Sequence, residues 1–178
     1  MGSERGATIW LTGLPCSGKS SIARLAAAQL QRRGRRVEIL DGDAVREHLS
    51  KGLGFSREDR DSNVQRIAFV AELLTRHGVL VLVAAISPYA QARGEARARI
   101  GDFIEVHVDC PLAECERRDV KGLYAKARAG TIAAFTGVSD PYQAPVAPEL
   151  VLRTLEQSPE QSVAQLLSYL EASGLLPL

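Results

Sequence analysis

The sequence predicts an α/β fold in which a five-stranded parallel sheet lies between two layers of helices, with a lid segment over one end. Five short apolar runs alternate with helix-like stretches, and this alternation is typical of a parallel sheet. The runs cover residues 7–12, 36–40, 79–86, 103–109 and 149–154. The 178 residues suit one domain that buries about 70% of its unfolded surface. We therefore expect a single domain over residues 1–178.

The first run leads into a glycine-rich loop, GLPCSGKS, at residues 13–20. This octapeptide fits G-x-x-x-x-G-K-[ST], in which the glycines let successive backbone N–H groups turn toward a phosphate. Lys19 can place its charge on the β- and γ-phosphates, and the Ser20 hydroxyl can bind Mg²⁺. A glycine turn that only connects a strand to a helix would leave Lys19 unexplained. The loop therefore predicts a site for the phosphates of a nucleotide.

Helices are predicted where apolar residues recur at helical spacing. Such spacing follows the glycine loop, at Ile22, Leu25, Ala26 and Leu30. A second helix is expected over residues 61–77 and a closing helix over residues 159–173, the latter with Ser158 as a candidate N-cap. The run VLVLVAAI at residues 79–86 is apolar at every position, as expected for a strand covered on both faces. We expect this strand to be central in the sheet.

Residues 119–148 interrupt the alternation of strands and helices. Glycines and prolines are interspersed there with charged residues and with apolar ones such as Leu123, Tyr124 and Phe135. Loops this long in a compact domain are usually functional, and the apolar residues argue against a disordered linker. We expect a mobile lid that closes over the phosphates and excludes water.

Two carboxylates follow the second run, in LDGDAVR at residues 40–46. We expect this strand to lie beside the first one, which would bring Asp41 and Asp43 to the edge where parallel sheets bind ligands. One carboxylate can hold the water shell of Mg²⁺ while the other accepts a proton from an attacking hydroxyl. A plain Asp-Gly turn remains the alternative interpretation.

A candidate acceptor site follows in GFSREDRDSNVQR, residues 54–66. Arg60, Asn63 and Arg66 are three apart, which we expect to place them roughly on one face of a helix. Two guanidinium groups beside an amide can bind a multiply charged anion, and Phe55 can stack on an aromatic ring. A solvated helix surface remains the alternative for these residues taken alone.

Composition narrows the choice of partners and compartment. A formal net charge of +1 argues against nucleic acids and membrane surfaces as partners recognised through bulk charge. The three cysteines, an odd number without a C-x-x-C pair, argue against a disulfide framework or a zinc site. We expect a reducing, cytoplasmic setting, no membrane-spanning segment and no export signal. Cys16 is interpreted as filling a variable loop position, with sensitivity to oxidation as the alternative.

Six motifs occur in the chain in a fixed order: the glycine loop, DGDAVR, LGFSREDRDSNVQR, ISPYAQAR, DVKGLYAKARAG and FTGVSDPYQAP. In these motifs, from about residue 9 to residue 154, the chain resembles the adenylylsulfate kinases, which phosphorylate adenosine 5′-phosphosulfate (APS). The resemblance implies a P-loop kinase fold, a homodimer and transfer of the γ-phosphate of MgATP to the ribose 3′-hydroxyl of APS. The products would be ADP and 3′-phosphoadenylylsulfate (PAPS), in sulfate activation and assimilation.

The resemblance also implies which residues bind each substrate. ATP would contact the glycine loop and two arginines near the lid: Gly13, Leu14, Pro15, Cys16, Ser17, Gly18, Lys19, Ser20, Ser21, Arg118 and Arg128. APS would contact the acceptor motifs and the lid: Asp43, Arg46, Phe55, Arg60, Asn63, Ile86, Ser87, Lys121, Leu123 and Phe135. Phe55 and Phe135 would sandwich the adenine of APS. Ser20 and Asp41 would serve the Mg²⁺ ion, and Lys19, Asp43 and Ser87 are the candidate catalytic residues.

The serine of the ISPY motif, Ser87 here, has been labelled a phosphoserine intermediate in this family. Phosphoryl transfer needs alignment and charge compensation rather than a covalent intermediate, and Lys19, Mg²⁺ and nearby arginines can supply both. We expect Ser87, at a strand end before Pro88, to act as a hydrogen-bonding positioner.

Two other functions are compatible with the glycine loop. A kinase of another small molecule, such as a nucleoside or a sugar acid, would share the loop, the sheet and the lid. It would not be expected to combine Phe55, Arg60 and Asn63 with Phe135. A GTPase-like switch should carry DxxG and NKxD motifs, which are not evident, and an inactive binding module would be expected to lack Lys19. The sequence carries no sulfurylase domain such as fused relatives have, and if it is a complete chain it is expected to act as a stand-alone kinase.

Overall fold

The chain forms one parallel sheet of five strands, as the sequence predicts. The computed structural model describes residues 5–177. The strands stand in the order β2-β3-β1-β4-β5, and each neighbouring pair is parallel. Their bounds are Ala7–Thr12 (β1), Val37–Asp41 (β2), Leu80–Ala84 (β3), Phe103–Asp109 (β4) and Leu150–Arg153 (β5).

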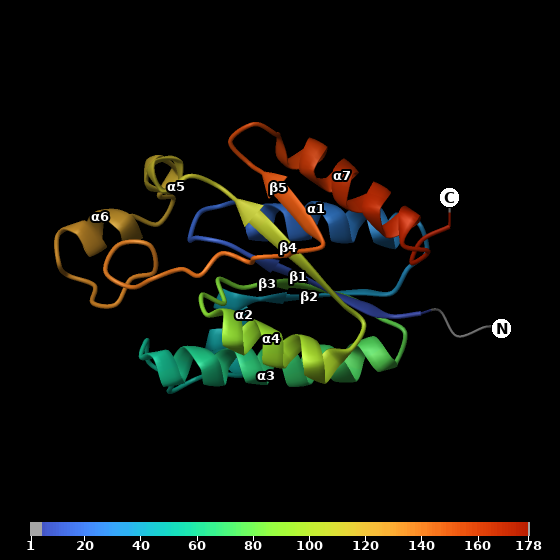
Figure 1. The fold of residues 1–178 in the computed structure, drawn as a ribbon, viewed down its shortest axis with the longest axis horizontal. Helices are drawn as coiled ribbons and strands as arrows, with labels where there is room; N and C mark the ends of the chain where they lie inside the picture. Colours follow the sequence, from blue (N-terminus) through green and yellow to red (C-terminus); the bar gives the residue numbers. More distant parts are fainter. Residues whose placement is uncertain (1–4, 178) are drawn as a thin grey trace.

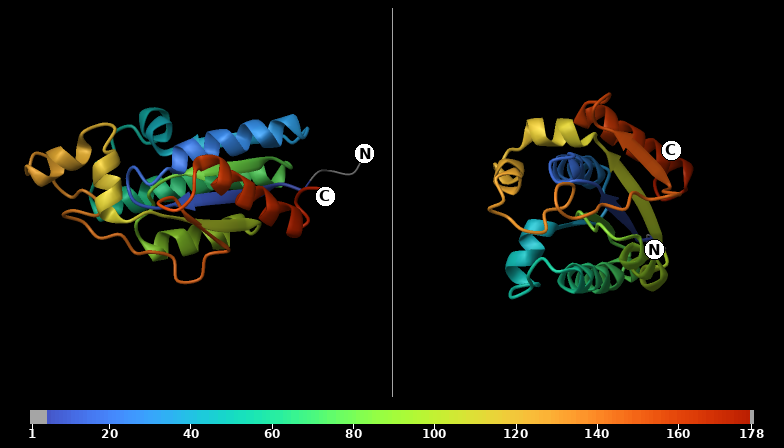
Figure 2. Two further views of the ribbon diagram at one scale, coloured as in Figure 1. Left: turned by 90° about the horizontal axis from the view of Figure 1, so that it is seen from above. Right: turned by 60° about the vertical axis from the view of Figure 1, so that its left-hand side comes forward.

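Helices cover both faces of the sheet and complete the three predicted layers (Figure 1, Figure 2). One face carries α1 (Lys19–Arg32) and α7 (Pro159–Ala172), and the other carries α2 (Gly42–His48), α3 (Arg57–Arg76) and α4 (Ala90–Ile100). Two short helices, α5 (Leu112–Arg118) and α6 (Leu123–Arg128), lie beyond the carboxyl ends of the strands, at the left of Figure 1. None of these described helices combines the length and the apolar character that a membrane crossing requires.

The order of the strands corrects two expectations. The strand β3 is fully buried and lies inside the sheet, but the central position belongs to β1. All inner strands are covered on both faces, so an apolar run cannot distinguish the central strand from its neighbour. The strand β2 pairs with β3 rather than with β1, because the connection through α1 passes over the position that β3 later fills. The carboxyl ends of all three strands still meet at one edge, since the strands are parallel.

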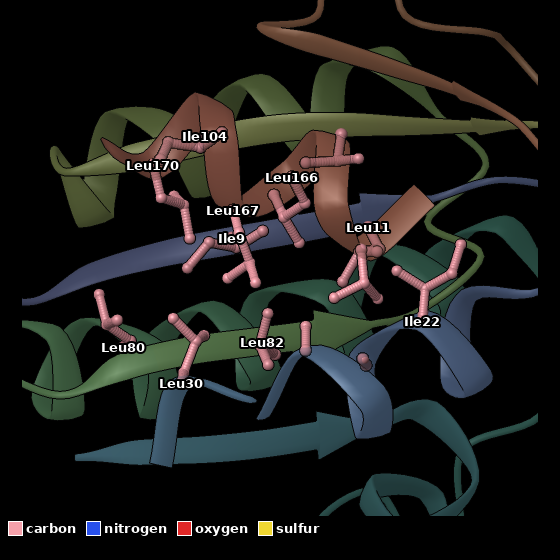
Figure 3. Close-up of a cluster of buried hydrophobic side chains, with 14 of the residues drawn as sticks. Ile9, Leu11, Ile22, Leu30, Leu80, Leu82, Ile104, Leu166, Leu167 and Leu170 are labelled. Carbon is pink, nitrogen blue, oxygen red and sulfur yellow. The ribbon is translucent and has the colours of Figure 1, made fainter. Parts of the chain in front are cut away.

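One hydrophobic core lies between the sheet and the layer of α1 and α7 (Figure 3). Ile9 and Leu11 of β1 and Leu82 of β3 are fully buried there against Leu30 of α1 and Leu166 of α7. Burying each of these side chains stabilises the fold by about 1.5–3 kcal/mol. This packing fixes α1 against β1, and it thereby fixes the two ends of the glycine loop that joins them.

A second core lies on the opposite face of the sheet, under α3 and α4. Trp10 of β1 is fully buried there and stacks on Phe103 of β4, with ring centroids 5.5 Å apart. The helices contribute small side chains to this core, among them Ala68 and Ala71 of α3 and Ala96 of α4. Their size lets the helices approach the sheet closely, so that the residues following β3 are held between the sheet and α4.

The helix α3 begins at Arg57, whereas the apolar spacing placed its start at residue 61. Ser56 caps the helix, because its hydroxyl accepts a hydrogen bond of 3.1 Å from the N–H of Asp59. A cap on a polar first turn is invisible to a pattern based on apolar residues. The earlier start places Arg60 and Asn63 inside the first two turns, where both are buried.

The lid segment, which we define as residues 119–148, is largely irregular, as the sequence predicts. It contains α6 and an isolated bridge between Thr136 and Asp140. Tyr124 of α6 is buried in a small cluster with Cys110 and Cys115, against which Phe135 packs. A small apolar cluster of its own therefore helps to attach the lid segment to the domain.

Candidate active site

A cavity of about 1000 Å³ opens over the carboxyl ends of β1, β2 and β3. Its lining combines the glycine loop, Asp41 at the end of β2 and Asp43 after it, the start of α3, the residues after β3 and the lid segment. The predicted site residues in this lining are Pro15, Cys16, Gly18, Lys19, Ser20, Ser21, Asp41, Asp43, Arg46, Phe55, Arg60, Asn63, Ile86, Ser87, Arg118, Lys121, Leu123 and Phe135. The structure thus brings the predicted donor and acceptor motifs to a single cleft.

Among the residues assigned to ATP or APS by the resemblance, four lie outside the lining of this cleft in the described chain: Gly13, Leu14, Ser17 and Arg128. Leu14 lines a shallower neighbouring cavity of about 590 Å³, together with lid residues 137–142. Arg128 of α6 forms an ion pair with Glu116 of α5. This pair occupies the guanidinium group that the resemblance assigned to ATP.

Arg66 does not join the acceptor site, contrary to the prediction from its spacing. Its guanidinium donates a hydrogen bond of 3.0 Å to the carbonyl oxygen of Leu49. Among the described residues, Arg66 is not part of the lining of the cleft. Each residue of a helix turns by 100°, so six residues separate Arg66 from Arg60 by about 120° around the axis. Asn63 lies closer to the direction of Arg60 and does line the cleft.

The glycine loop has the tight geometry that a phosphate site needs. A side chain at Gly13 would place its Cβ 2.5 Å from the carbonyl oxygen of Val108, so this position has room only for glycine. Gly18 has φ 107°, in the left-handed region. Cys16 also has a positive φ, of 61°, which costs a residue with a side chain about 1–3 kcal/mol. The loop thus stores strain at the cysteine that lines the cleft.

Lys19 is buried and points into its own loop. Its ammonium donates to the carbonyl oxygens of Gly13, at 2.9 Å, and Leu14, at 2.6 Å, and to the hydroxyl of Ser17, at 3.3 Å. Burial lowers the pKa of Lys19 to about 8, because desolvation disfavours the charged form. Phosphate oxygens would be stronger acceptors than these neutral groups, so a bound nucleotide can draw the ammonium out of the loop.

Asp41 closes β2 and caps α2. Its Oδ1 atom accepts a hydrogen bond of 3.1 Å from the N–H of Asp43. Its Oδ2 atom is buried without a hydrogen-bond partner among residues 5–177, and the nearest cation, Arg24, is 4.0 Å away. A buried carboxylate oxygen in a cleft that also contains the Ser20 hydroxyl fits a magnesium ion, which prefers oxygen ligands.

The metal would depend on its substrate for most of its ligands. In the described part of the chain, His, Cys, Asp and Glu side chains form no group of three or more that could hold an ion. Mg²⁺ commonly binds through one or two protein oxygens together with substrate phosphates and water. Ser20 and Asp41 therefore suit a metal that arrives with a nucleotide.

Asp43 faces the lid segment across the mouth of the cleft. Its carboxylate is 77% exposed and forms an ion pair with the ammonium of Lys121. The hydrogen bond to Asp43 raises the pKa of Lys121. An exposed pair of this kind contributes about 1 kcal/mol or less to stability. Substrates can therefore separate the two side chains at little cost.

The acceptor half of the cleft combines positive charge with an exposed aromatic ring. Phe55 is 57% exposed, and the guanidinium of Arg46 lies 4.6 Å from the centre of its ring. Burial lowers the pKa of Arg46, and the neighbouring charge of Arg60 adds to this effect. Two guanidinium groups that repel each other in a cleft form a natural site for an anion, which relieves the repulsion.

Arg60 connects α3 to the lid segment. It is buried and donates to the carbonyl oxygen of Phe55 at 2.9 Å, to the hydroxyl of Thr136 at 2.8 Å and to the carbonyl oxygen of Ala134. Asn63 is also buried, and its Oδ1 atom has no hydrogen-bond partner within residues 5–177. The arginine therefore shapes the acceptor half, while the asparagine offers it an unused acceptor atom.

Phe135 stands on the lid side of the acceptor half. Its ring packs edge-on against Tyr124, with centroids 5.0 Å apart. The N–H of Phe135 donates to the hydroxyl of Ser139 at 2.9 Å. These contacts fix the ring in the lining of the same cavity as Phe55.

Ser87 has a buried and fully bonded hydroxyl. Its Oγ atom accepts a hydrogen bond of 2.9 Å from the indole Nε1 of Trp10 and donates one of 3.1 Å to the carbonyl oxygen of Ala85. The residue adopts φ 43°, which is rare for a residue with a side chain. The hydroxyl therefore serves the protein's own hydrogen bonding, as a positioner would.

The cleft also contains residues that the sequence did not single out: Arg24, Val120, Ile132, Thr136 and Gln157. Arg24 lies on α1 one turn after Ser20. This spacing was a signal from which a position near the phosphates could have been predicted. Thr136 enters through a contact between segments far apart in the sequence, the bond from Arg60 to Thr136. Sequence spacing carries no signal for contacts of this kind.

The chain as a whole is similar to known proteins of one family. The family model "Adenylylsulphate kinase" matches residues 5–153. The adenylyl-sulfate kinase of Synechococcus sp. (strain JA-3-3Ab) is 59% identical over 97% of this chain and 98% of that protein. The Mycobacterium tuberculosis APS kinase CysC, solved in complex with AMPPNP and APS, superposes with a TM-score of 0.90, at 48% identity over 94% of this chain and 98% of that one. The hexameric APS kinase from Thiobacillus denitrificans gives a TM-score of 0.74 and 37% identity over 98% of this chain, which spans 30% of that one.

Proposed function

The chain belongs to the adenylylsulphate kinase family, and we propose how the residues of its cleft divide the reaction of that family. The protein is an ATP-dependent kinase that phosphorylates APS and yields PAPS and ADP. One observation carries the assignment of roles. A single cavity joins a phosphate-binding loop to a second site, in which guanidinium groups lie beside an exposed aromatic ring.

The donor end of the cleft takes the phosphates of ATP. The free backbone N–H groups of the glycine loop, which exclude those of Pro15 and Ser17, would face the phosphate chain together with the start of α1. Lys19 leaves the carbonyl groups of its loop and places its charge on the β- and γ-phosphates. Arg118 stands on the side of the adenine, where it donates to the carbonyl oxygen of Thr154 at 2.7 Å. The ion pair between Arg128 and Glu116 speaks against a contact of Arg128 with ATP.

The acceptor end takes APS, with its adenine between Phe55 and Phe135. Stacking on an aromatic ring contributes about 1–3 kcal/mol per base. Arg46, Arg60 and Asn63 hold the phosphosulfate, since the first two supply charge and the third an amide. The other proposed contacts, to the nucleoside and from the lid, are Ile86, Ser87, Lys121 and Leu123.

Asp43 is the proposed base for the 3′-hydroxyl of APS. It lines the cavity that also contains the glycine loop and the acceptor residues, and it is exposed enough to meet a substrate hydroxyl. Accepting that proton as the oxygen attacks the γ-phosphate in line would accelerate the reaction by about 10²–10⁴-fold. Before the transfer, the substrates separate Lys121 from Asp43, and Lys121 moves to the phosphosulfate as the lid segment closes and excludes water.

Magnesium is the proposed metal, held by Ser20 and through the free oxygen of Asp41. A magnesium ion held there with ATP would supply charge neutralisation at the β- and γ-phosphates. Ser87 positions the acceptor nucleoside through the backbone around it, and no covalent step passes through its hydroxyl. Both assignments rest on the chemistry of the side chains: an orphaned carboxylate oxygen in one case, and a hydroxyl with its hydrogen already used in the other.

We further propose a cytoplasmic homodimer that serves sulfate assimilation. The three free cysteines suit a reducing compartment. The dimer follows from the resemblance of the chain to its family, whereas the hexamer belongs to a protein of which this chain spans 30%. Measurement of the mass in solution distinguishes the two states.

Release of ADP from MgATP in the presence of different acceptors tests the proposed function. We expect release with APS, and background release with adenosine, shikimate or gluconate. Lys19→Ala protein controls for contaminating ATPase activity, since it lacks the charge on the phosphates. Release with one of the other acceptors but not with APS would overturn the assignment and favour a kinase of another small molecule.

A further inference from the structure

Arg93 of α4 is a buried guanidinium that joins three separate segments of the chain. It is 3% exposed and donates to the carboxylate of Glu105 on β4, at 2.7 Å. It also donates to the backbone carbonyl oxygen of Ser87, at 2.7 Å, and to that of Gln143, at 2.7 Å. Desolvating an arginine is costly unless its donors are satisfied. The three bonds offset this cost, and they join α4 to the residues after β3 and to the lid segment.

The bond to Gln143 holds one end of a wall, which we define as residues 134–143 of the lid segment. The N–H of Gln143 donates to the carbonyl oxygen of Pro88 at 2.8 Å, and its side-chain oxygen accepts from the N–H of Ala90 at 2.8 Å. The hydroxyl of Tyr142 lies 3.1 Å from the hydroxyl of Thr12, the last residue of β1. This end of the wall is therefore fixed on the residues that follow β1 and β3.

The rest of the wall is held from α3 and from the start of α4. Arg60 donates to Ala134 and to Thr136, and the hydroxyl of Tyr89 donates to Asp140 at 2.8 Å. Phe135, which lines the acceptor half of the cleft, stands inside this held stretch. The wall is thus bonded to the domain at both ends and in the middle, in contrast to a lid that moves as one piece.

The bond to Ser87 holds the opposite side of the acceptor half. Ser87 adopts φ 43°, and a strained backbone of this kind persists only where its surroundings fix it. Arg93 donates a hydrogen bond to the carbonyl oxygen of Ser87, and Trp10 donates one to its hydroxyl. One guanidinium therefore bonds to both Ser87 and Gln143, and Gln143 ends the bonded stretch that contains Phe135.

We propose that Arg93 is a positioning residue for the acceptor substrate, because it locks the wall to the strand end that carries Ser87. The residue does not reach the substrate; it sets the width of the acceptor half between Ser87 and Phe135. This inference rests on the proposed function, in which that half of the cleft binds APS. It also divides the lid segment, because residues 134–143 stay in place and the motion on closure is confined to residues 119–133.

Arg93→Lys tests the proposal, with Arg97→Lys as the matched control. Lysine keeps the charge beside Glu105 but cannot bridge two carbonyl groups as the guanidinium fork does. Arg97 lies one turn further along α4 and also pairs with Glu105 and with Glu149, yet it touches neither Ser87 nor Gln143 in the described structure. Both substitutions replace an arginine that pairs with Glu105, but only Arg93→Lys also alters the bonds to Ser87 and Gln143.

We expect Arg93→Lys to raise the KM for APS about tenfold, with the KM for ATP changed by less than about twofold. We expect Arg97→Lys to leave both constants near those of the parent protein. An equal rise of both KM values in Arg93→Lys, or the same change in Arg97→Lys, would overturn the proposal. Glu105→Gln is the second variant, for use if Arg93→Lys does not fold. It removes the charge that pairs with Arg93 on the side away from the cleft, and it should also raise the KM for APS.

Amide hydrogen exchange supplies a readout that does not depend on turnover. We expect faster exchange in residues 134–143 of Arg93→Lys than in the parent, with exchange in α1 and α7 unchanged. If the parent does not phosphorylate APS, the proposed function fails while this exchange difference still supports the role of Arg93 in holding the wall. Unchanged exchange in the wall overturns the inference, whatever the acceptor is.

Discussion

The indole Nε1 of Trp10 lies 2.9 Å from the Oγ atom of Ser87 and donates a hydrogen bond to it. A serine hydroxyl has one hydrogen to donate, and Ser87 gives its hydrogen to the carbonyl oxygen of Ala85. Both groups are buried. A nucleophile needs a free approach to phosphorus and a base to take its proton, and this serine has neither in its present contacts. The contact with Trp10 is therefore the strongest argument for a structural role.

Ser87→Ala should keep a substantial part of the turnover. We expect kcat to fall by less than about tenfold, because alignment and charge compensation remain in place. The free energy of unfolding should fall by about 1–3 kcal/mol, since the substitution leaves the N–H of Trp10 without an acceptor. Steady-state kinetics together with chemical denaturation measure both effects. Complete loss of turnover with intact APS binding would instead support a phosphoserine intermediate.

Asp43→Asn should impair turnover far more than binding of ATP. We expect kcat to fall by about 10²-fold or more, because asparagine cannot accept the proton of the 3′-hydroxyl. The KM for ATP should change little, since the phosphates are held by the glycine loop. Glu47→Gln is the matched control, as Glu47 lies on the same helix and is exposed. Turnover of Asp43→Asn near that of the control would remove Asp43 from the role of base.

Binding of ATP should weaken as the pH rises through about 8. The pKa of Lys19 is lowered to about 8 by burial, and the charges of a bound triphosphate would raise it again. Below pH 8 the ammonium is charged with and without ATP, so affinity should be level there. Above pH 8 the free protein loses the proton that the complex keeps, so binding takes up a proton and affinity falls. Titration calorimetry at pH 8.5 in two buffers of different ionisation heat measures this uptake, and equal heats would contradict it.

Asp41→Asn should raise the concentration of Mg²⁺ needed for half-maximal turnover. The change removes the charge of the orphaned Oδ2 atom but keeps a side-chain oxygen that can cap α2, so the fold should be preserved. We expect a rise of about tenfold, by analogy with the loss of one oxygen ligand, and no activity in any variant when EDTA removes the metal. An unchanged magnesium requirement in a folded Asp41→Asn protein would show that this carboxylate serves only as the helix cap.

Local patterns in the sequence predict those parts of the molecule that local physics determines. The bounds of β1 and β4 match the apolar runs, and the glycine loop lies where GLPCSGKS places it. Asp41 at the end of β2 and Asp43 after it both line the cleft, although the strand order that led to this expectation was wrong. Any strand of a parallel sheet would have brought them to the same edge, which explains why a mistaken neighbour did not matter.

Contacts between distant segments could not be predicted from the sequence. Arg60 was expected to bind the substrate, and nothing in the sequence indicated its bond to Thr136, which spans 76 positions and serves the wall. The bond from Arg93 to Gln143 spans 50 positions, and the pattern of α4 does not distinguish Arg93 from Arg97 or Arg99. Which arginine turns inward depends on the packing of α4 against α3 and the sheet, and local spacing does not contain that information.

The identity of the phosphorylated atom tests the central claim most directly. Purified protein is incubated with MgATP and APS, and in parallel with an APS analogue that lacks the ribose 3′-hydroxyl. We expect APS to give PAPS and ADP in equal amounts, with the phosphate at the 3′ position by phosphorus NMR, and the analogue to give ADP at the background rate. Release of ADP from the analogue at the rate seen with APS, or a phosphate at another position, would contradict the assignment of the cleft.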